Sequence, residues 1–207
     1  MHRDGVHLTN TSVLARIPEH PNKIRNKKQI FVQQNPDDSI SESIRSVLTA
    51  VDFSFNINKD HQVIMVAGLI PHVGKSFVSM NLAASFGLVG KKVLYIDADM
   101  RKAVCRYTHE GLTDVLMGRR TFEDVVYRGS GIKDFDILES GTFNMAAFEL
   151  LRGDMFKKLL DELRPQYDIR KYQIWATGTT SSMCPARSRR TFFSVTSTPQ
   201  RSQTMPL

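Results

Sequence analysis

The chain has 207 residues, a length that fits one domain of ordinary size or a smaller domain with tails. Hydrophobic residues make up 41% of the chain, which is enough for a core. No apolar run is long enough to span a bilayer, and the first residues do not have the pattern of a signal peptide. We therefore expect a cytoplasmic protein in which Cys105 and Cys184 are reduced thiols. The net charge of +7 is concentrated in residues 169–207, which carry six basic side chains and no acidic one, so the rest is nearly neutral and we expect no nucleic-acid partner.

The first 35 residues are polar and basic, and they include the stretch "HPNKIRNKKQ". We therefore interpret residues 1–35 as a solvated basic linker. The next stretch, "NPDDSISESIRSVLTAVDFSF", begins with Pro, two acids and Ser, which are typical of a helix start. Apolar residues follow at helical spacing, and they predict a helix over about 38–54.

Strands and helices alternate from residue 62 onward. The β-branched run "QVIMVAG" predicts a buried strand over 62–68, helical periodicity follows over about 75–88, and "KKVLYIDAD" predicts a second strand over 91–99. Two short helices are predicted in "GLTDVLMG" and "TFEDVVYR", a third strand over 134–141, and one helix from about 146 to 163. This alternation is typical of a parallel α/β sheet with flanking helices.

The pattern changes after Asp168. Between Ala176 and Leu207, 13 of 32 residues are Ser or Thr, and no periodic apolar face is present. Such a composition buries too little surface to offset the entropy of ordering the chain. We therefore predict a disordered tail, or translation in a shifted frame, over 169–207, and a sheet that is incomplete at its C-terminal side. The predicted organisation is a basic linker over 1–35, a partial P-loop domain over 36–168 and this tail.

The segment "GLIPHVGKS" lies between the first predicted strand and its helix, where parallel α/β folds bind ligands. Gly74 lets the backbone approach a phosphate closely, and the N–H groups of the helix start would surround its oxygens. Lys75 adds a positive charge, and the Ser76 hydroxyl is suited to Mg²⁺. Five residues separate Gly68 from Gly74, one more than in the usual loop, but the strand–loop–helix context favours a nucleotide site.

A second group of charged residues follows the next predicted strand, in "VLYIDADMRK". Asp97 and Asp99 lie two positions apart at a strand end, so both face the same crevice. Arg101 follows them at once. A lysine, a magnesium ion and two carboxylates would supply the charge neutralisation that phosphoryl transfer needs.

Taken together, these residues resemble the kinase domain of the bacterial tyrosine kinases, or BY-kinases, of capsule and exopolysaccharide export. The resemblance runs from about Ser12 to Asp168 and is carried by "SESIRSVLTAVDFSF", "GLIPHVGKSFVSMNLAASFGLVGKKVLYIDADMRK", "GLTDVLMG" and "FELLRGDMFKKLLDELRPQYDI". It accounts for the long loop, because the family's Walker A loop has the same spacing. It implies a P-loop NTPase-like sheet and ATP-dependent autophosphorylation on tyrosine, with ATP and Mg²⁺ as cofactors.

The resemblance also implies roles for individual residues. Lys75, Asp97, Asp99 and Arg101 would be catalytic, and Ser76 with the two aspartates would bind the metal. Tyr107 lies near the family's internal phosphotyrosine, although its spacing from Asp99 differs. The ATP-binding residues would be Gly68, Pro71, His72, Val73, Gly74, Lys75, Ser76 and Phe77.

Membership would also imply partners and a location. These are other kinase subunits in a ring, a membrane polysaccharide co-polymerase segment or partner, and a cognate tyrosine phosphatase, at the cytoplasmic face of the bacterial inner membrane. The family's assembly motif Glu-x-x-Arg-x-x-Arg stands here as Glu42, Arg45 and Leu48, so its second arginine is missing. The apolar strand that ends in the family's Walker B aspartate is not evident after "YDI", and the tail has one tyrosine, Tyr172, in place of a tyrosine cluster.

These departures predict a fragment with little or no activity and keep two other functions open. One is an ATPase switch of the MinD/ParA type, which shares the fold and motifs; those proteins usually carry an additional lysine early in the loop, which "GLIPH" lacks. The other is a non-enzymatic docking fragment of a membrane kinase complex, for which the "ESIRSVL" helix and the basic linker would supply the contacts.

Overall fold

A parallel sheet forms the centre of the molecule. The computed structural model describes residues 15–18, 30–55, 63–67, 74–100, 109–167, 172–176 and 190–194. The strands in these ranges are β1 (Val63–Ala67), β2 (Val93–Asp97), β3 (Phe135–Leu138), β4 (Tyr172–Ala176) and β5 (Arg190–Ser194). They form one five-stranded sheet in the order β3-β2-β4-β1-β5, with every neighbouring pair parallel. The predicted α/β sheet is therefore confirmed.

Both faces of the sheet are buried at β1 and β2, as parallel sheets require. Side chains alternate along each strand: in β2, Val93 and Tyr95 belong to one hydrophobic cluster, and Leu94 and Ile96 belong to another. The first cluster packs under α2 and α3, and the second under α4 to α7. The sequence shows continuous apolar runs at these strands because both sets of side chains leave water.

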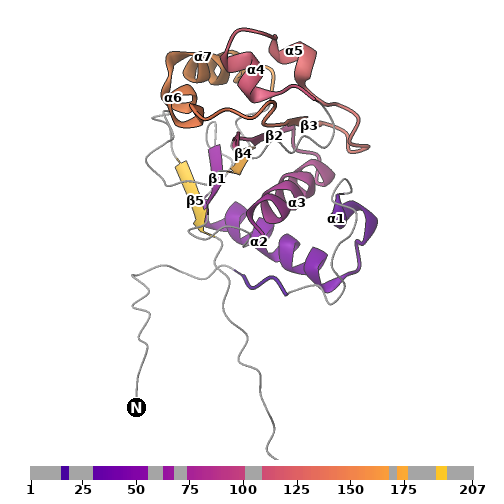
Figure 1. Cartoon of the computed structure of the whole chain (residues 1–207). Helices are drawn as coiled ribbons and strands as arrows, with labels where there is room; N and C mark the ends of the chain where they lie inside the picture. Colours follow the sequence, from indigo (N-terminus) through magenta and orange to yellow (C-terminus); the bar gives the residue numbers. More distant parts are fainter. Residues whose placement is uncertain are drawn as a thin grey trace, which may run out of the picture.

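The helices divide between the two faces, as Figure 1 shows. The helices α1 (Phe31–Gln34), α2 (Ser39–Phe55) and α3 (Lys75–Leu88) cover one face. The other face carries α4 (Leu112–Leu116), α5 (Phe122–Val125), α6 (Ala147–Arg152) and α7 (Asp154–Leu163). The bounds of α3 are those predicted from the periodicity.

The single helix predicted over about 146–163 is divided in two. Gly153 has φ −68° and ψ 159°, an extended conformation that ends α6 and precedes α7. Its N–H still donates to the Glu149 carbonyl oxygen at 2.9 Å. Asp154 follows as an acid in the first turn of α7, which favours a new helix start. The pair Gly-Asp is thus the local signal for the break.

Two strands lie in the predicted tail. β4 takes a central position between β1 and β2, and β5 pairs with the outer edge of β1. The expectation of a disordered or frame-shifted segment over 169–207 is therefore not met by residues 172–176 and 190–194. The rest of that segment lies outside the described residues, and the proposed domain boundaries stay a prediction.

The end of the predicted linker is also structured. Ile30, Phe31 and Val32 are buried against α3 and belong to the core beneath it, and Ala15 and Ile17 pack on the same cluster. The prediction of a solvated linker is wrong for these residues. Three consecutive apolar side chains, "IFV", were the signal that the basic composition around them obscured.

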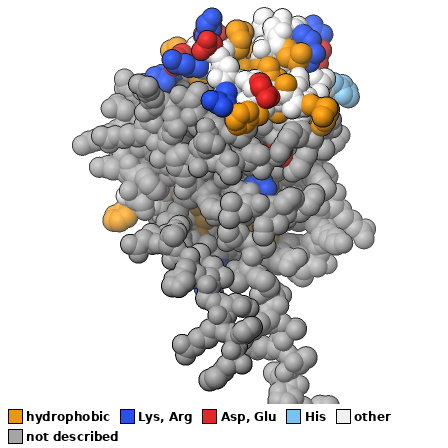
Figure 2. Space-filling model, turned by 60° about the vertical axis from the view of Figure 1, so that its left-hand side comes forward, with side chains coloured by type: hydrophobic (Ala, Val, Ile, Leu, Met, Phe, Trp, Pro, Cys, Tyr) orange, Lys and Arg blue, Asp and Glu red, His pale blue; other side chains and the backbone are white. Residues whose placement is uncertain are grey.

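The surface over α4 to α7 mixes apolar side chains with charges of both signs (Figure 2). Its most exposed large apolar side chains include Phe143 and Met145 in the loop after β3 and Met155 in α7. Within the described residues, none of the helices has the length and apolar character needed to cross a bilayer.

Candidate nucleotide-binding site

The start of α3 has the geometry of a phosphate-binding helix. Gly74, directly before the helix, has φ +87°, a left-handed conformation that glycine adopts without strain. No atom lies within 4 Å of where a Cβ would stand, so the backbone angle, and not crowding, calls for glycine. Lys75 is the first residue of α3 and is 7% exposed, while Ser76 and Phe77 in the same turn are half-buried. The Val78 N–H donates to the Gly74 carbonyl oxygen at 2.9 Å, which closes this first turn.

The two predicted aspartates lie at the end of β2. Asp97 closes the strand and is half-buried, and the alternation of side chains places it on the face that α3 covers. The Asp99 N–H donates to the Asp97 Oδ1 at 3.0 Å, which orients that carboxylate. Asp99 is itself 7% exposed. The Asp97 carboxylate is thus held by the backbone that follows β2.

Lys75 and Asp97 share one edge of the sheet. All strands run the same way, so the end of β2 and the loop after β1 lie at the same edge. One strand, β4, separates them, which corresponds to about 10 Å between the ends of β1 and β2. That spacing leaves room for the phosphates of a nucleotide. The other predicted site residues, namely Gly68, Pro71, His72, Val73, Arg101 and Tyr107, lie outside the described residues.

The oxygen ligands at this edge of the sheet suit a magnesium ion better than a metal that is coordinated entirely by protein side chains. In the described part of the chain, no group of three or more His, Cys, Asp or Glu side chains is placed to hold a metal. Mg²⁺ does not require such a cage, because it keeps several waters and binds one or two protein ligands together with phosphate. The Ser76 hydroxyl and the Asp97 carboxylate are ligands of that kind.

Glu42 and Arg45, which are predicted to take part in ring assembly, bond to each other, and Arg45 also bonds to the backbone just before α2. Arg45 donates from its guanidinium to Glu42 Oε2 at 2.6 Å and to the Pro36 carbonyl oxygen at 2.6 Å. Leu48, where the family motif has its second arginine, is half-buried and packs on the core beneath α2. The exposed face of α2 therefore presents one of the two arginines of that motif.

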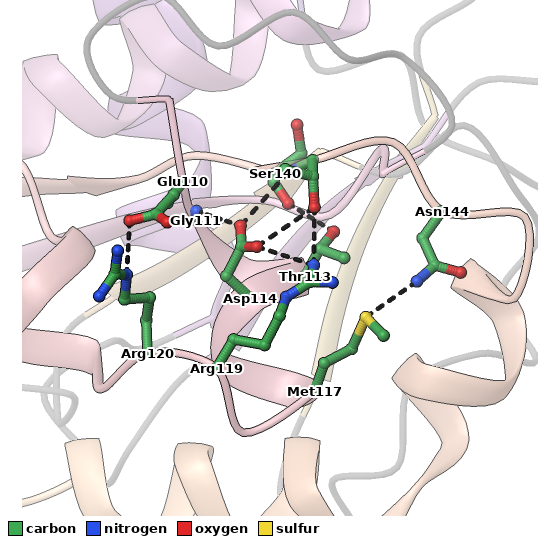
Figure 3. A network of polar contacts seen from close by, with 10 residues as sticks. Glu110, Gly111, Thr113, Asp114, Met117, Arg119, Arg120, Ser140 and Asn144 are labelled. Atoms are coloured by element: carbon green, nitrogen blue, oxygen red, sulfur yellow. Dashed lines mark hydrogen bonds and ion pairs between the residues drawn. The ribbon is translucent and has the colours of Figure 1, made fainter.

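A buried carboxylate that the sequence analysis missed lies on the other side of the sheet (Figure 3). Asp114 Oδ2 accepts from the Gly111 N–H at 2.9 Å, and its Oδ1 accepts from Arg119 at 2.8 Å and from the Thr142 hydroxyl at 3.2 Å. Burial raises the pKa of Asp114, but these hydrogen bonds outweigh it, so the net pKa is lowered. The pattern Gly-x-x-Asp at a helix start was the available signal, since the third helical residue reaches back to the cap.

The Asp114 network fastens α4 to the loop after β3. Thr113 donates from its hydroxyl and its N–H to the Ser140 carbonyl oxygen, at 2.8 and 3.0 Å. The Asn144 N–H donates to the Met100 carbonyl oxygen at 3.1 Å, which ties the same loop to the backbone after β2. A Cβ on Gly111 would stand 2.2 Å from the Glu139 carbonyl oxygen, so this close approach requires glycine. The network thus supports the segment that carries Asp97 and Asp99.

Comparisons with known proteins decide the family. The chain is 35% identical over 178 residues to EpsB of Ralstonia solanacearum, an alignment that covers 78% of this chain and 23% of that protein. It is 34% identical over 169 residues to the tyrosine-protein kinase ptk of Acinetobacter johnsonii, covering 75% and 23%. The solved kinase domain of the Escherichia coli tyrosine kinase ETK superposes with a TM-score of 0.67 at 28% identity, covering 81% of this chain and 69% of that domain.

The chain is a homologue of the bacterial tyrosine kinases. The resemblance drawn from its motifs is thereby confirmed, and so is the P-loop NTPase-like fold. The BY-kinase relatives are much longer, and this chain spans less than a quarter of EpsB and ptk. No protein-family model matches the chain. The likeness to ETK extends over four fifths of the chain.

Proposed function

We propose that this BY-kinase homologue binds MgATP and transfers its terminal phosphate to tyrosine in proteins, including copies of itself, as part of a capsule or exopolysaccharide system. The observation that carries the proposal is the placement of Lys75 at the start of α3, beside a left-handed Gly74, at the same sheet edge as Asp97. Tyrosine as the acceptor rests on the family alone.

Each residue has a distinct role in this proposal. Lys75 and the N–H groups of the first turn of α3 stabilise the negative charge that shifts on the terminal phosphate during transfer. Ser76 and Asp97 hold Mg²⁺, which neutralises phosphate charge when it is bound. Asp99 accepts the proton of the tyrosine hydroxyl, and Arg101 contacts phosphate or a neighbouring subunit. ATP would contact Gly68, Pro71, His72, Val73 and Phe77 as well.

The end of β4 argues for a slow enzyme. In register, Ala176 pairs with Asp97 of β2 on one side and with Val66 of β1 on the other. The resemblance implies that the strand after "YDI" ends in a Walker B aspartate, whereas β4 ends in Ala176. An alanine there supplies no carboxylate to the metal, so we expect activity well below that of the longer relatives.

The test is phosphotyrosine formation from labelled ATP. Purified protein is incubated with MgATP, and phosphotyrosine is separated from free phosphate after acid hydrolysis. We expect wild-type protein to form phosphotyrosine, and Lys75→Ala to lower the rate by about 100-fold or more, as expected for loss of a charge that acts on the transition state. Lys157→Ala, at an exposed lysine of α7, is the matched control and should retain the wild-type rate.

The same assay separates the alternatives. Release of free phosphate without phosphotyrosine would overturn the kinase proposal in favour of an ATPase switch of the MinD/ParA type. Absence of ATP binding together with co-purification of a longer homologue would favour a docking fragment. The subunit ring, the co-polymerase partner, the phosphatase and the inner-membrane location belong to the same proposal, and the Glu42–Arg45 pair with Leu48 argues for weak ring assembly.

A further inference from the structure

The phosphate-binding helix is joined to a segment that lies far ahead of it in the sequence. Asn81, two turns into α3, is 2% exposed, and its Oδ1 accepts from the Val32 N–H at 3.1 Å. Its Nδ2 donates to the Phe77 carbonyl oxygen at 2.8 Å. One buried amide therefore bonds both to α1 and to the first turn of the helix that carries Lys75.

An aromatic contact strengthens this junction. The rings of Phe31 and Phe77 meet edge to face, with centroids 5.7 Å apart and planes at 63°. Phe31 is 6% exposed, and Phe77 lies two residues after Lys75. Figure 1 shows α1 lying alongside α3 on the same face of the sheet. The ring contact and the amide bond are thus adjacent, and both involve Phe77.

The N-terminal end of helix α1 depends on α3 for a hydrogen-bond acceptor. Ile30 precedes α1 and makes no side-chain cap, so the Val32 N–H in this single turn takes its acceptor from outside the helix. The Asn81 side chain supplies that acceptor. Docking of α1 and the position of the first turn of α3 are for this reason coupled, because the same side chain holds both.

We propose that Asn81 and Phe31 are positioning residues for nucleotide binding, and that residues 30–34 form a clip that fixes the start of α3 and with it Lys75 and Ser76. This inference rests on the proposed nucleotide site. When the clip is released, the first turn of α3 loses support, and affinity for MgATP falls although no residue of the clip contacts phosphate.

The first test compares nucleotide affinity in two matched pairs of variants. Phe31→Leu removes the ring contact and keeps an apolar side chain, whereas Phe122→Leu removes an equivalent edge-to-face pair with Tyr167 on the other face of the sheet. Asn81→Ala is paired with Ser85→Ala, which loses a buried side-chain bond one turn further along α3. MgATP affinity is measured by calorimetry on the full chain.

We expect Phe31→Leu and Asn81→Ala to weaken MgATP binding by between about twofold and tenfold, as the energy of an aromatic pair or one buried hydrogen bond implies. Phe122→Leu and Ser85→Ala should stay within about twofold of wild type. Equal weakening in both members of each pair would mean a general loss of stability and would overturn the proposal.

A second measurement keeps the clip distinguishable from the proposed function. Hydrogen exchange of the Val78 amide, which closes the first turn of α3, is followed in nucleotide-free protein. Asn81→Ala should accelerate this exchange more than Ser85→Ala does. If wild-type protein fails to bind MgATP, the nucleotide proposal and the affinity role of the clip fall together, and exchange still decides whether the clip supports the helix. Equal exchange in the two variants would overturn the clip.

Discussion

At the scale of single residues, Asp114 shows how a charge is retained inside this protein. Its carboxylate is 4% exposed and accepts hydrogen bonds from both backbone and side chains. The charged form is favoured in the folded state, and the lowered pKa is the result. This side chain contributes to stability without taking part in the proposed chemistry.

Asp114→Asn should destabilise the fold by about 1–3 kcal/mol at pH 7, because the new amide group faces donors such as the Gly111 N–H. The folded-state pKa lies below the unfolded value, so the stabilisation is full above about pH 4 and is lost as pH falls through the folded pKa. Urea unfolding at pH 7 and at successively lower pH checks this. The control is Asp161→Asn, which removes an exposed ion pair with Arg164, and it should change the unfolding free energy little at pH 7 or at low pH. If the loss of unfolding free energy in Asp114→Asn did not become smaller at low pH, the charge-based account would be contradicted.

Tyr167 offers a second test at this scale. Burial and its hydrogen bond to Asp136 Oδ2, at 2.6 Å, raise the pKa of Tyr167, so the hydroxyl remains a donor at neutral pH. Tyr167→Phe should cost about 1 kcal/mol of unfolding free energy. Tyr127→Phe is the comparison, because its hydroxyl donates to the Gly129 carbonyl oxygen at the surface and should matter less. Equal losses in urea titrations would show that the Asp136 bond contributes nothing specific.

Residues that act through local pattern were predictable, and those that act across the chain were not. Lys75 and Asp97 stand at fixed offsets from apolar runs, so strand ends and helix starts could be assigned around them. Asn81 could not be recognised, because its partner Val32 lies 49 positions away and an asparagine in a helix carries no signal by itself. The role of Asn81 can be recognised only from its tertiary contact with Val32.

At the scale of elements, the largest difference between the prediction and the structure concerns the strands β4 and β5. The stretch "YQIWA" of β4 has the β-branched and aromatic residues of a strand but only five positions, and the polar sequence around it dominated its interpretation. The periodicity of α3 persists over 14 residues, and its bounds were predicted to the residue. β1 and β2 also have five residues and were predicted, so the polar sequence on either side of β4, more than its length, prevented its recognition.

The register of β4 leads to a gain-of-function prediction. Because Ala176 pairs with Asp97, Ala176→Asp would place a carboxylate at the sheet edge between the two proposed phosphate-site strands. Phosphotyrosine formation should rise by about tenfold or more if metal support limits the rate. Ala176→Asn, which has the same shape without the charge, should not increase it. A rise in both variants would point to a steric cause.

At the scale of the whole molecule, bound nucleotide should stabilise the fold by mass action. At 100 times its dissociation constant, MgATP adds about 2.7 kcal/mol, which corresponds to a rise in Tm of about 5–10 °C for a domain of this size. Lys75→Met should abolish most of the rise, and Lys157→Met should preserve it. Thermal scans with and without MgATP measure both, and an equal rise in the two variants would place the nucleotide elsewhere.

The order of strands also has a consequence for biosynthesis. β4 lies between β1 and β2 in space, yet it follows β1, β2 and β3 along the chain. During translation, β2 and β3 pair early, whereas β1 has no described neighbour until residues 172–176 have left the ribosome. A nascent chain that stops before Tyr172 therefore holds the β2–β3 pair and the single strand β1, all with open edges, which is a state that chaperones would recognise.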